Sequence, residues 1–150
     1  MVADQSEQYE NELGGTTTSR FLSYQMEDSA AREDFVSDVT CREPTVRFFD
    51  YPVTDSFDVH WRERCTELIR GCRGTIVLVG RTTFQSAPVT WEIAETVGQG
   101  LPVMGVRLFD EDMTEAPMGL ERAALISRPD VSSVVLRLQA WSARAEDDMS

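Results

Sequence analysis

The chain has 150 residues, of which 41% are hydrophobic and 27% are charged, a composition typical of one globular domain with its own core. Its formal net charge is −12. Nucleic acids and anionic membranes are bound through basic surface, so this charge argues against either as a partner. The sequence also contains no apolar run near the roughly 20 residues of a membrane span.

The cysteines and the single histidine restrict the chemistry further. Cys41, Cys65 and Cys72 are odd in number and form no C-x-x-C pair, which favours free thiols in a reducing compartment. The first residues have neither the basic nor the apolar part of a secretory leader, so we expect a cytoplasmic protein. His60 is the only histidine, and we expect no metal site.

Composition along the chain predicts one domain with two disordered ends. Residues 1–18 carry four acids and no base, followed by a glycine- and threonine-rich stretch, which is typical of a disordered segment. The domain is expected over residues 19–145. The last residues, 146–150, are predicted to be a disordered tail.

The first part of the domain begins with a strand. Residues 20–24, "RFLSY", form a short apolar run with aromatic side chains. Residues 27–39 follow with apolar side chains at a spacing of four and with capping residues at the start, which predicts a helix. Residues 45–51, "TVRFFDY", predict a second strand that ends before a proline.

The middle of the chain contains the clearest strand. Residues 59–72 have a helical apolar face. Residues 74–80, "GTIVLVG", are apolar on both faces, as is typical of a central parallel strand. A helix is predicted over residues 86–100 with Pro88 in its first turn, and residues 101–108 predict the next strand.

The pattern after residue 108 is weaker. Residues 123–127 predict a short last strand, and residues 130–145 have helical spacing. Strands that alternate with helices predict a parallel sheet with helices on both faces. We therefore expect an α/β, flavodoxin-like, three-layer fold with five parallel strands in the order 2-1-3-4-5.

Several common sites of this fold are excluded by the sequence. All fourteen basic residues are arginine, so the chain has neither the lysine of a phosphate-binding P-loop nor that of a response-regulator receiver. It also contains no G-x-G-x-x-G fingerprint and no G-x-S-x-G nucleophile elbow.

Three stretches, taken in order, resemble TIR domains. "RFLSYQMED" resembles the first strand of that family and the loop after it, and residues 74–108 resemble its third strand, third helix and fourth strand. The helix "SAPVTWEIAE" and the later "MGVRL" are most similar to the TIR-like branch of bacterial Thoeris anti-phage systems, the ThsB type. The chain departs from that pattern at Pro88, where a tryptophan is usual.

The resemblance implies an enzyme that cleaves NAD at the nicotinamide–ribose bond with a glutamate on the third helix. By motif that residue is Glu92, directly before Ile93. The rival is Glu95, which lies at W-x-x-x-E spacing from Trp91. We expect Glu92 in the first turn of the helix. The alternative is that it only stabilises the helix N-terminus, by about 0.3–1 kcal/mol.

The same resemblance places other residues around the substrate. Ser23, Tyr24 and Gln25 end the first strand and are expected to line the same crevice, and Tyr24 is either a stacking platform or a core aromatic. Asp50 begins the loop 50–58, which the resemblance implies closes the site and mediates self-association. The expected substrate-binding residues are Ser23, Tyr24, Gln25, Asp50, Phe57, Arg81, Ser86 and Trp91.

Three of these substrate-binding assignments have equally ordinary alternatives. Phe57 is expected either at an interface or packed on Trp61. Arg81 either meets a pyrophosphate or is a surface charge. Trp91 either shapes the pocket or packs below the sheet edge.

The resemblance also implies partners and alternatives. NAD is expected as the substrate and no cofactor is needed. The product would be linear or cyclic ADP-ribose, sensed by a separate effector, and the trigger would be derived from a phage. The alternatives are a TIR adaptor that binds partners without activity, and a nucleoside deoxyribosyltransferase-like enzyme.

Overall fold

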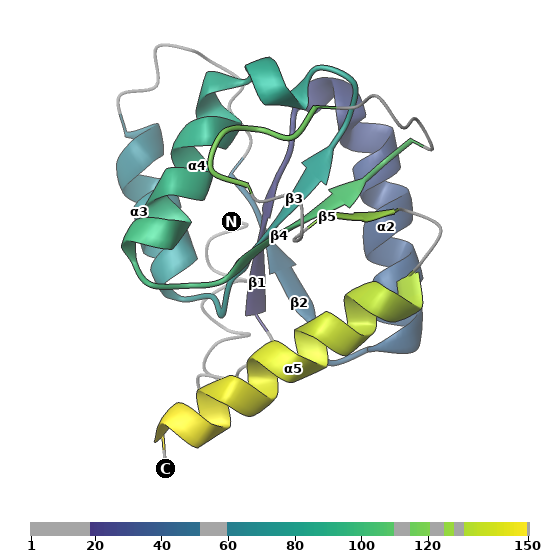
Figure 1. Cartoon of the computed structure of the whole chain (residues 1–150), viewed down its shortest axis with the longest axis vertical. Helices are drawn as coiled ribbons and strands as arrows, with labels where there is room; N and C mark the ends of the chain where they lie inside the picture. Colours follow the sequence, from purple (N-terminus) through teal and green to yellow (C-terminus); the bar gives the residue numbers. More distant parts are fainter. Residues whose placement is uncertain (1–18, 52–59, 110–114, 121–124, 128–130, 150) are drawn as a thin grey trace.

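The computed structural model describes residues 19–51, 60–109, 115–120, 125–127 and 131–149 (Figure 1). All strands of its sheet are parallel, and their order is β2-β1-β3-β4-β5. The strands are β1 (Ser19–Ser23), β2 (Arg47–Phe49), β3 (Thr75–Val79), β4 (Val103–Arg107) and β5 (Leu125–Ser127). The α/β fold that the sequence predicts, with a parallel sheet and helices beside it, is confirmed.

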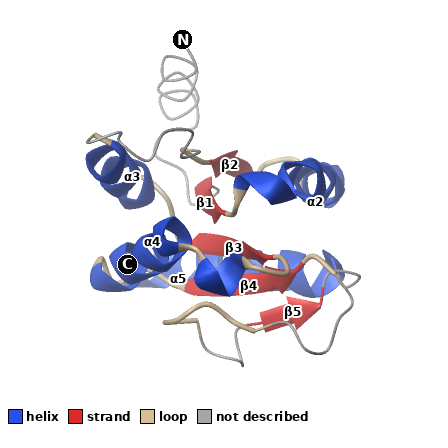
Figure 2. Ribbon diagram, turned by 90° about the horizontal axis from the view of Figure 1, so that it is seen from above, coloured by secondary structure: helices blue, strands red, loops and turns tan. Residues whose placement is uncertain are grey.

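The helices form a layer on each side of the sheet (Figure 2). Contacts between α3 and α4 lie on one side, and contacts between α2 and α5 on the other. Helix α5 begins beside α2 and crosses below the amino ends of the strands (Figure 1). The helices are α2 (Ser29–Arg42), α3 (Trp61–Arg70), α4 (Ala87–Gly98) and α5 (Val131–Met149), with short 3-10 turns η1 (Met26–Asp28) and η2 (Thr83–Gln85).

Strand β3 is central, as "GTIVLVG" predicts. It pairs with β1 on one side and β4 on the other, and all five of its residues are buried. Alternate side chains enter different cores, with Ile76 facing α2 and α5 and Val77 facing α4. Every residue must therefore be apolar or internally hydrogen-bonded, which explains why this strand has no polar face.

Helix α5 ends later than predicted. The sequence predicts a disordered tail over residues 146–150, but the helix continues to Met149. Residues 143–146, "ARAE", are good helix formers, and they offset the unfavourable acids at the helix C-terminus. The predicted disordered segment 1–18 lies outside the described residues.

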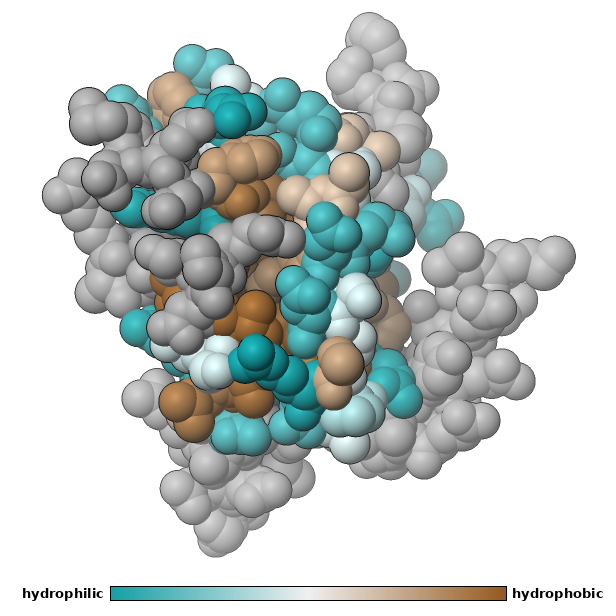
Figure 3. Space-filling view, turned by 90° about the vertical axis from the view of Figure 1, so that its right-hand side faces the viewer, coloured by the Kyte–Doolittle hydropathy of each residue, from teal (hydrophilic) through white to brown (hydrophobic). Residues whose placement is uncertain are grey.

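Polar surface surrounds a few exposed hydrophobic side chains. Figure 3 shows hydrophilic and hydrophobic residues side by side on one face, with hydrophobic ones gathered near its centre. Met26, Val97, Met118 and Leu136 are the exposed large hydrophobic residues of the described part. No described helix is both long enough and apolar enough to cross a membrane.

Candidate active site

A cavity of about 280 Å³ lies at the carboxyl ends of β1 and β2, beside the start of α4. Ligands of parallel α/β sheets bind at this edge, where loops after the strands meet helix N-termini. The described residues that line it are Leu22, Tyr24, Gln25, Met26, Glu27, Asp50, Tyr51, Ser86, Pro88 and Glu92. Tyr24, Gln25, Asp50, Ser86 and Glu92 are residues that the sequence analysis selects.

Glu92 lies deeper in α4 than the sequence predicts. The helix begins at Ala87, so Glu92 is its sixth residue and belongs to the second turn, not the first. Ser86 caps the helix, since its hydroxyl oxygen accepts a hydrogen bond from the backbone N–H of Val89 at 3.2 Å. The helical period then turns Glu92 toward the sheet, where it is 5% exposed. Its role as a mere partner of the helix N-terminus does not fit this position.

Two donors hold the carboxyl group of Glu92. Ser23 Oγ, at the end of β1, donates to Oε1 at 2.6 Å, and Cys65 Sγ, on α3, donates to Oε2 at 3.4 Å. Burial raises the pKa of Glu92 to about 7, against the opposing effect of these two hydrogen bonds. The carboxyl group therefore changes charge near neutral pH, as is common for groups at functional sites.

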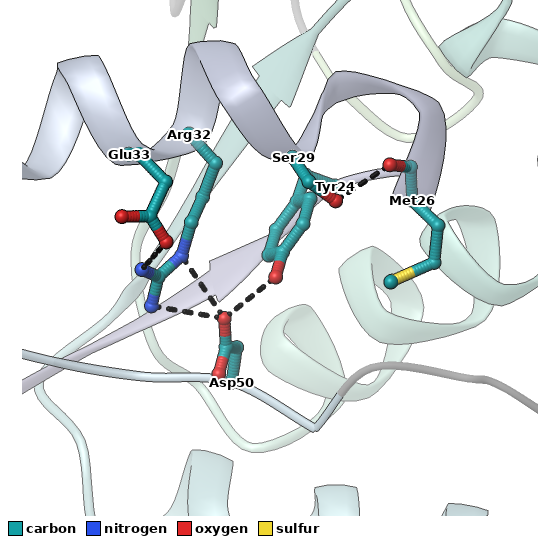
Figure 4. Close-up of polar contacts among 6 residues, drawn as sticks. All are labelled: Tyr24, Met26, Ser29, Arg32, Glu33 and Asp50. Atoms are coloured by element: carbon teal, nitrogen blue, oxygen red, sulfur yellow. Dashed lines mark hydrogen bonds and ion pairs between the residues drawn. The ribbon is translucent and has the colours of Figure 1, made fainter.

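A second polar network forms one wall of the cavity (Figure 4). Tyr24 Oη donates to Asp50 Oδ2 at 2.9 Å, and the guanidinium of Arg32, on α2, pairs with the same oxygen at 3.1 Å. Burial, followed by the charge and hydrogen bond of Asp50, raises the pKa of Tyr24 to about 12. Tyr24 therefore stays a neutral hydrogen-bond donor across the physiological range.

The loop after β1 is tied to the loop after β3. Thr82 Oγ1 is within hydrogen-bond distance of Gln25 Oε1 at 3.1 Å and of the Glu27 carboxylate. Asp28 packs directly on Gly80, where a Cβ atom would overlap its carboxyl group. These contacts fix the rim of the cavity and explain why a glycine ends the "TIVLVG" strand.

Four other predicted residues lie away from the cavity lining. Arg81 is exposed, with its guanidinium carbon 4.4 Å from the Phe109 ring centroid. Trp91 packs on Trp61, with ring centroids 5.1 Å apart. The carboxylate of Glu95 accepts a hydrogen bond from Gln99 Nε2 at 3.1 Å.

Ser23 is the fourth predicted residue outside the cavity lining. It is buried, and its hydroxyl group contacts Glu92. Phe57 and residues 52–59 of the predicted closing loop lie outside the described residues.

Sequence reasoning missed Cys65, Tyr51, Glu27 and Met26. Cys65 reads as an ordinary core residue of the amphipathic helix 59–72, and only the packing of α3 beside α4 brings it to Glu92. No described group of three or more histidine, cysteine or acidic side chains is arranged to hold a metal ion.

Comparisons with known proteins show the family and the fold of the chain. The family model described as "Thoeris protein ThsB, TIR-like domain" matches residues 21–112. A crystal structure of the TIR domain of the Toll-related receptor TRR-2 from Hydra magnipapillata has a TM-score of 0.58 and 16% identity. That match covers 83% of this chain and 97% of the Hydra domain, and at this identity it shows the fold.

No curated protein matches the chain. The family match covers more than half of the chain, including the strand that ends at Ser23 and the helix that carries Glu92. The chain therefore belongs to the family of Thoeris ThsB proteins with a TIR-like domain.

Proposed function

We propose that this protein consumes NAD by cleaving the bond between nicotinamide and ribose, with Glu92 as the catalytic residue. The observation that carries the proposal is the buried Glu92 carboxyl group, which lines the cavity at the carboxyl edge of the sheet and accepts a hydrogen bond at each oxygen. Glu95, the rival in the sequence, is not among the described residues of the cavity lining.

The chemistry of this bond suits one carboxylate. Cleavage of an N-glycosidic bond builds positive charge on the ribose, in an oxocarbenium-like transition state. The nicotinamide of NAD is a cationic leaving group and needs no general acid. A fixed negative charge beside the ribose lowers the energy of the transition state without moving during the reaction. The ionised form of Glu92 is therefore the active form.

The charge of the cavity supports the same substrate. Its charged lining residues in the described part of the chain are Glu27, Asp50 and Glu92, all acidic. Asp50 is paired with Arg32, and the carboxylates of Glu27 and ionised Glu92 attract a cation such as the nicotinamide of NAD. The volume of about 280 Å³ is just below the range of about 300–1,000 Å³ that is usual for ligand pockets. It suits the nicotinamide riboside half, with the phosphates and adenosine lying outside.

We also propose the product of NAD cleavage and its biological role, on the basis of the family. The ribosyl cation is captured either by water, which gives ADP-ribose, or by an atom of the same molecule, which gives a cyclic ADP-ribose. In anti-phage immunity a separate effector would sense the cyclic product. We also propose that the segment 50–58 mediates self-association and that a phage component triggers activity in the cytoplasm.

Release of free nicotinamide tests the proposal. The protein is incubated with NAD over a range of protein concentrations, and it is also co-expressed with candidate phage triggers. Nicotinamide is measured by chromatography. The proposal expects nicotinamide in stoichiometric excess over protein, and none with Glu92→Gln. Absence of nicotinamide in all these preparations would support the adaptor function. Exchange of bases on deoxynucleosides without NAD cleavage would support the deoxyribosyltransferase-like alternative.

A further inference from the structure

Cys65 contacts the functional carboxyl group from a different helix. It lies on α3, its side chain is 0% exposed, and its sulfur is 3.4 Å from Oε2 of Glu92 on α4. Ser23 donates to the other oxygen, Oε1, from β1. Three elements thus meet at one carboxyl group, and its two oxygens are held from two sides.

We propose that Cys65 is a positioning residue for Glu92, whose thiol fixes Oε2 and favours the ionised carboxylate. This inference rests on the proposed function. A carboxylate held at one oxygen only is able to rotate about its last side-chain bond. A second donor on Oε2 restricts that rotation and keeps the carboxylate in one orientation, as preorganised electrostatic catalysis requires.

Cys65 lies in an apolar cluster, so packing is the alternative to a positioning role. Cys65 belongs to a core cluster with Phe21, Trp61, Ile69 and Cys72. A buried cysteine usually acts as a small hydrophobic residue, and Cys72 is the comparison within the same cluster. The bond to Glu92 gives Cys65 a polar partner on α4.

The hydrogen bond from Cys65 opposes the effects of burial and of Asp50 on the pKa of Glu92. Burial raises the pKa of Glu92 most strongly, and the negative charge of Asp50, after β2, raises it further. The bonds from Ser23 on β1 and Cys65 on α3 lower it, because a donor favours the charged form of its acceptor. Removal of the thiol is therefore expected to raise the pKa of Glu92 and to reduce the fraction of active enzyme below pH 7.

Substitutions at Cys65 distinguish the two roles. Cys65→Ala and Cys65→Val remove the donor with a smaller and a larger side chain, and Cys65→Ser keeps a donor. If Cys65 positions Glu92, Cys65→Ser is more active than Cys65→Ala and Cys65→Val. If Cys65 only packs, Cys65→Ser is the least stable and least active of the three, since a hydroxyl group is costly in an apolar core. Cys72→Ala is the matched control and is expected to leave the pH profile unchanged.

The pH profile of nicotinamide release is the first measurement. Cys65→Ala and Cys65→Val are expected to lower kcat at pH 6 by about threefold to tenfold, with KM little changed, and Cys65→Ser to restore most of the loss. Equal profiles for the donor and non-donor variants, or a loss in Cys65→Ser as large as in Cys65→Ala, would overturn the inference.

A carboxyl titration makes the test independent of activity. ¹³C NMR of glutamate-labelled protein, with the Glu92 signal identified by its absence in Glu92→Gln, gives the pKa of Glu92 directly. A higher pKa in Cys65→Ala and Cys65→Val, but not in Cys65→Ser or Cys72→Ala, supports the inference even in a preparation without NAD cleavage. An unchanged pKa in active protein would contradict the inference and leave the proposed function standing.

Discussion

Ser23 Oγ donates a hydrogen bond of 2.6 Å to Oε1 of Glu92, a residue 69 positions further along the chain. The bond joins the end of β1 to the second turn of α4, and both side chains are buried. Because the donor lies on a strand that is paired on both sides, the carboxyl group has a fixed position relative to the sheet. Ser23 therefore acts on the candidate site through Glu92, not by lining the substrate pocket as the sequence suggested.

Replacement of Ser23 by alanine tests this relationship. Ser23→Ala removes the donor to Oε1, so the pKa of Glu92 is expected to rise and kcat for NAD cleavage to fall about tenfold or more at pH 7, since hydrogen bonds to charged groups contribute roughly 1.5–3 kcal/mol. Ser19→Ala, at the other end of β1, is the matched control. Similar pH–rate profiles for Ser23→Ala and Ser19→Ala would contradict the assignment.

The raised pKa of Glu92 predicts a pH-dependent effect on stability. The folded protein holds the Glu92 proton up to about pH 7, whereas the ordinary pKa of a glutamate side chain is 4.5. Stability from this group is therefore full below pH 4.5 and is lost as the pH rises toward 7, by up to about 3 kcal/mol. Glu92→Gln, which carries no charge, is expected to gain stability relative to wild type over this window.

Urea unfolding at pH 5 and pH 8 measures this difference. The expected result is a variant that is near wild type at pH 5 and more stable at pH 8. Glu95→Gln, a partly exposed position on the same helix, serves as the control and is expected to show little change at either pH. A Glu92→Gln variant less stable than wild type at pH 8 would show that the ionised carboxylate is stabilising, contrary to its burial.

The sequence predicts the parts of this structure that depend on local pattern. The buried strand at residues 75–79 and the cavity-lining Glu92 follow from an apolar run and a family motif. The contacts of Ser23 and Cys65 with Glu92 do not, because they depend on how β1, α3 and α4 pack, and side chains distant in sequence leave no periodic signal. Cys65 in particular matches the spacing of an ordinary core position.

Gly80 is expected to tolerate no side chain. A Cβ there would overlap the carboxyl group of Asp28, which is 7% exposed. Gly80→Ala should therefore destabilise the fold by about 1–3 kcal/mol. The loss should be smaller in an Asp28→Ala background, since the overlapping atoms are gone. Gly98→Ala, where no atom lies within 4 Å of the added group, is the control.

Thermal unfolding of the four members of this double-mutant cycle measures the coupling. Additive losses for Gly80→Ala and Asp28→Ala would show that the two residues do not compete for the same space.

Tyr24, in the wall of the cavity, is expected to ionise only at an unusually high pH. Burial and Asp50 raise the pKa of Tyr24 to about 12. Asp50→Asn should lower that pKa, because it removes a negative charge beside the phenol. Ultraviolet absorbance during alkaline titration measures the ionisation, and the difference from Tyr24→Phe identifies the signal. Glu33→Gln, at the exposed partner of Arg32, should lower the pKa of Tyr24 less than Asp50→Asn does, because the charge of Glu33 is the smallest of the causes that raise it. A higher pKa in Asp50→Asn would contradict the network in Figure 4.

Nicotinamide release by two matched variants tests the central claim most directly. Glu92→Gln and Glu95→Gln make the same change three residues apart on one helix, and both are assayed with concentrated or trigger-co-expressed protein that cleaves NAD as wild type. Loss of one preorganised electrostatic group costs about 10²–10³ in rate. We expect that loss for Glu92→Gln and near wild-type release for Glu95→Gln. Full activity of Glu92→Gln, with or without loss in Glu95→Gln, would contradict it.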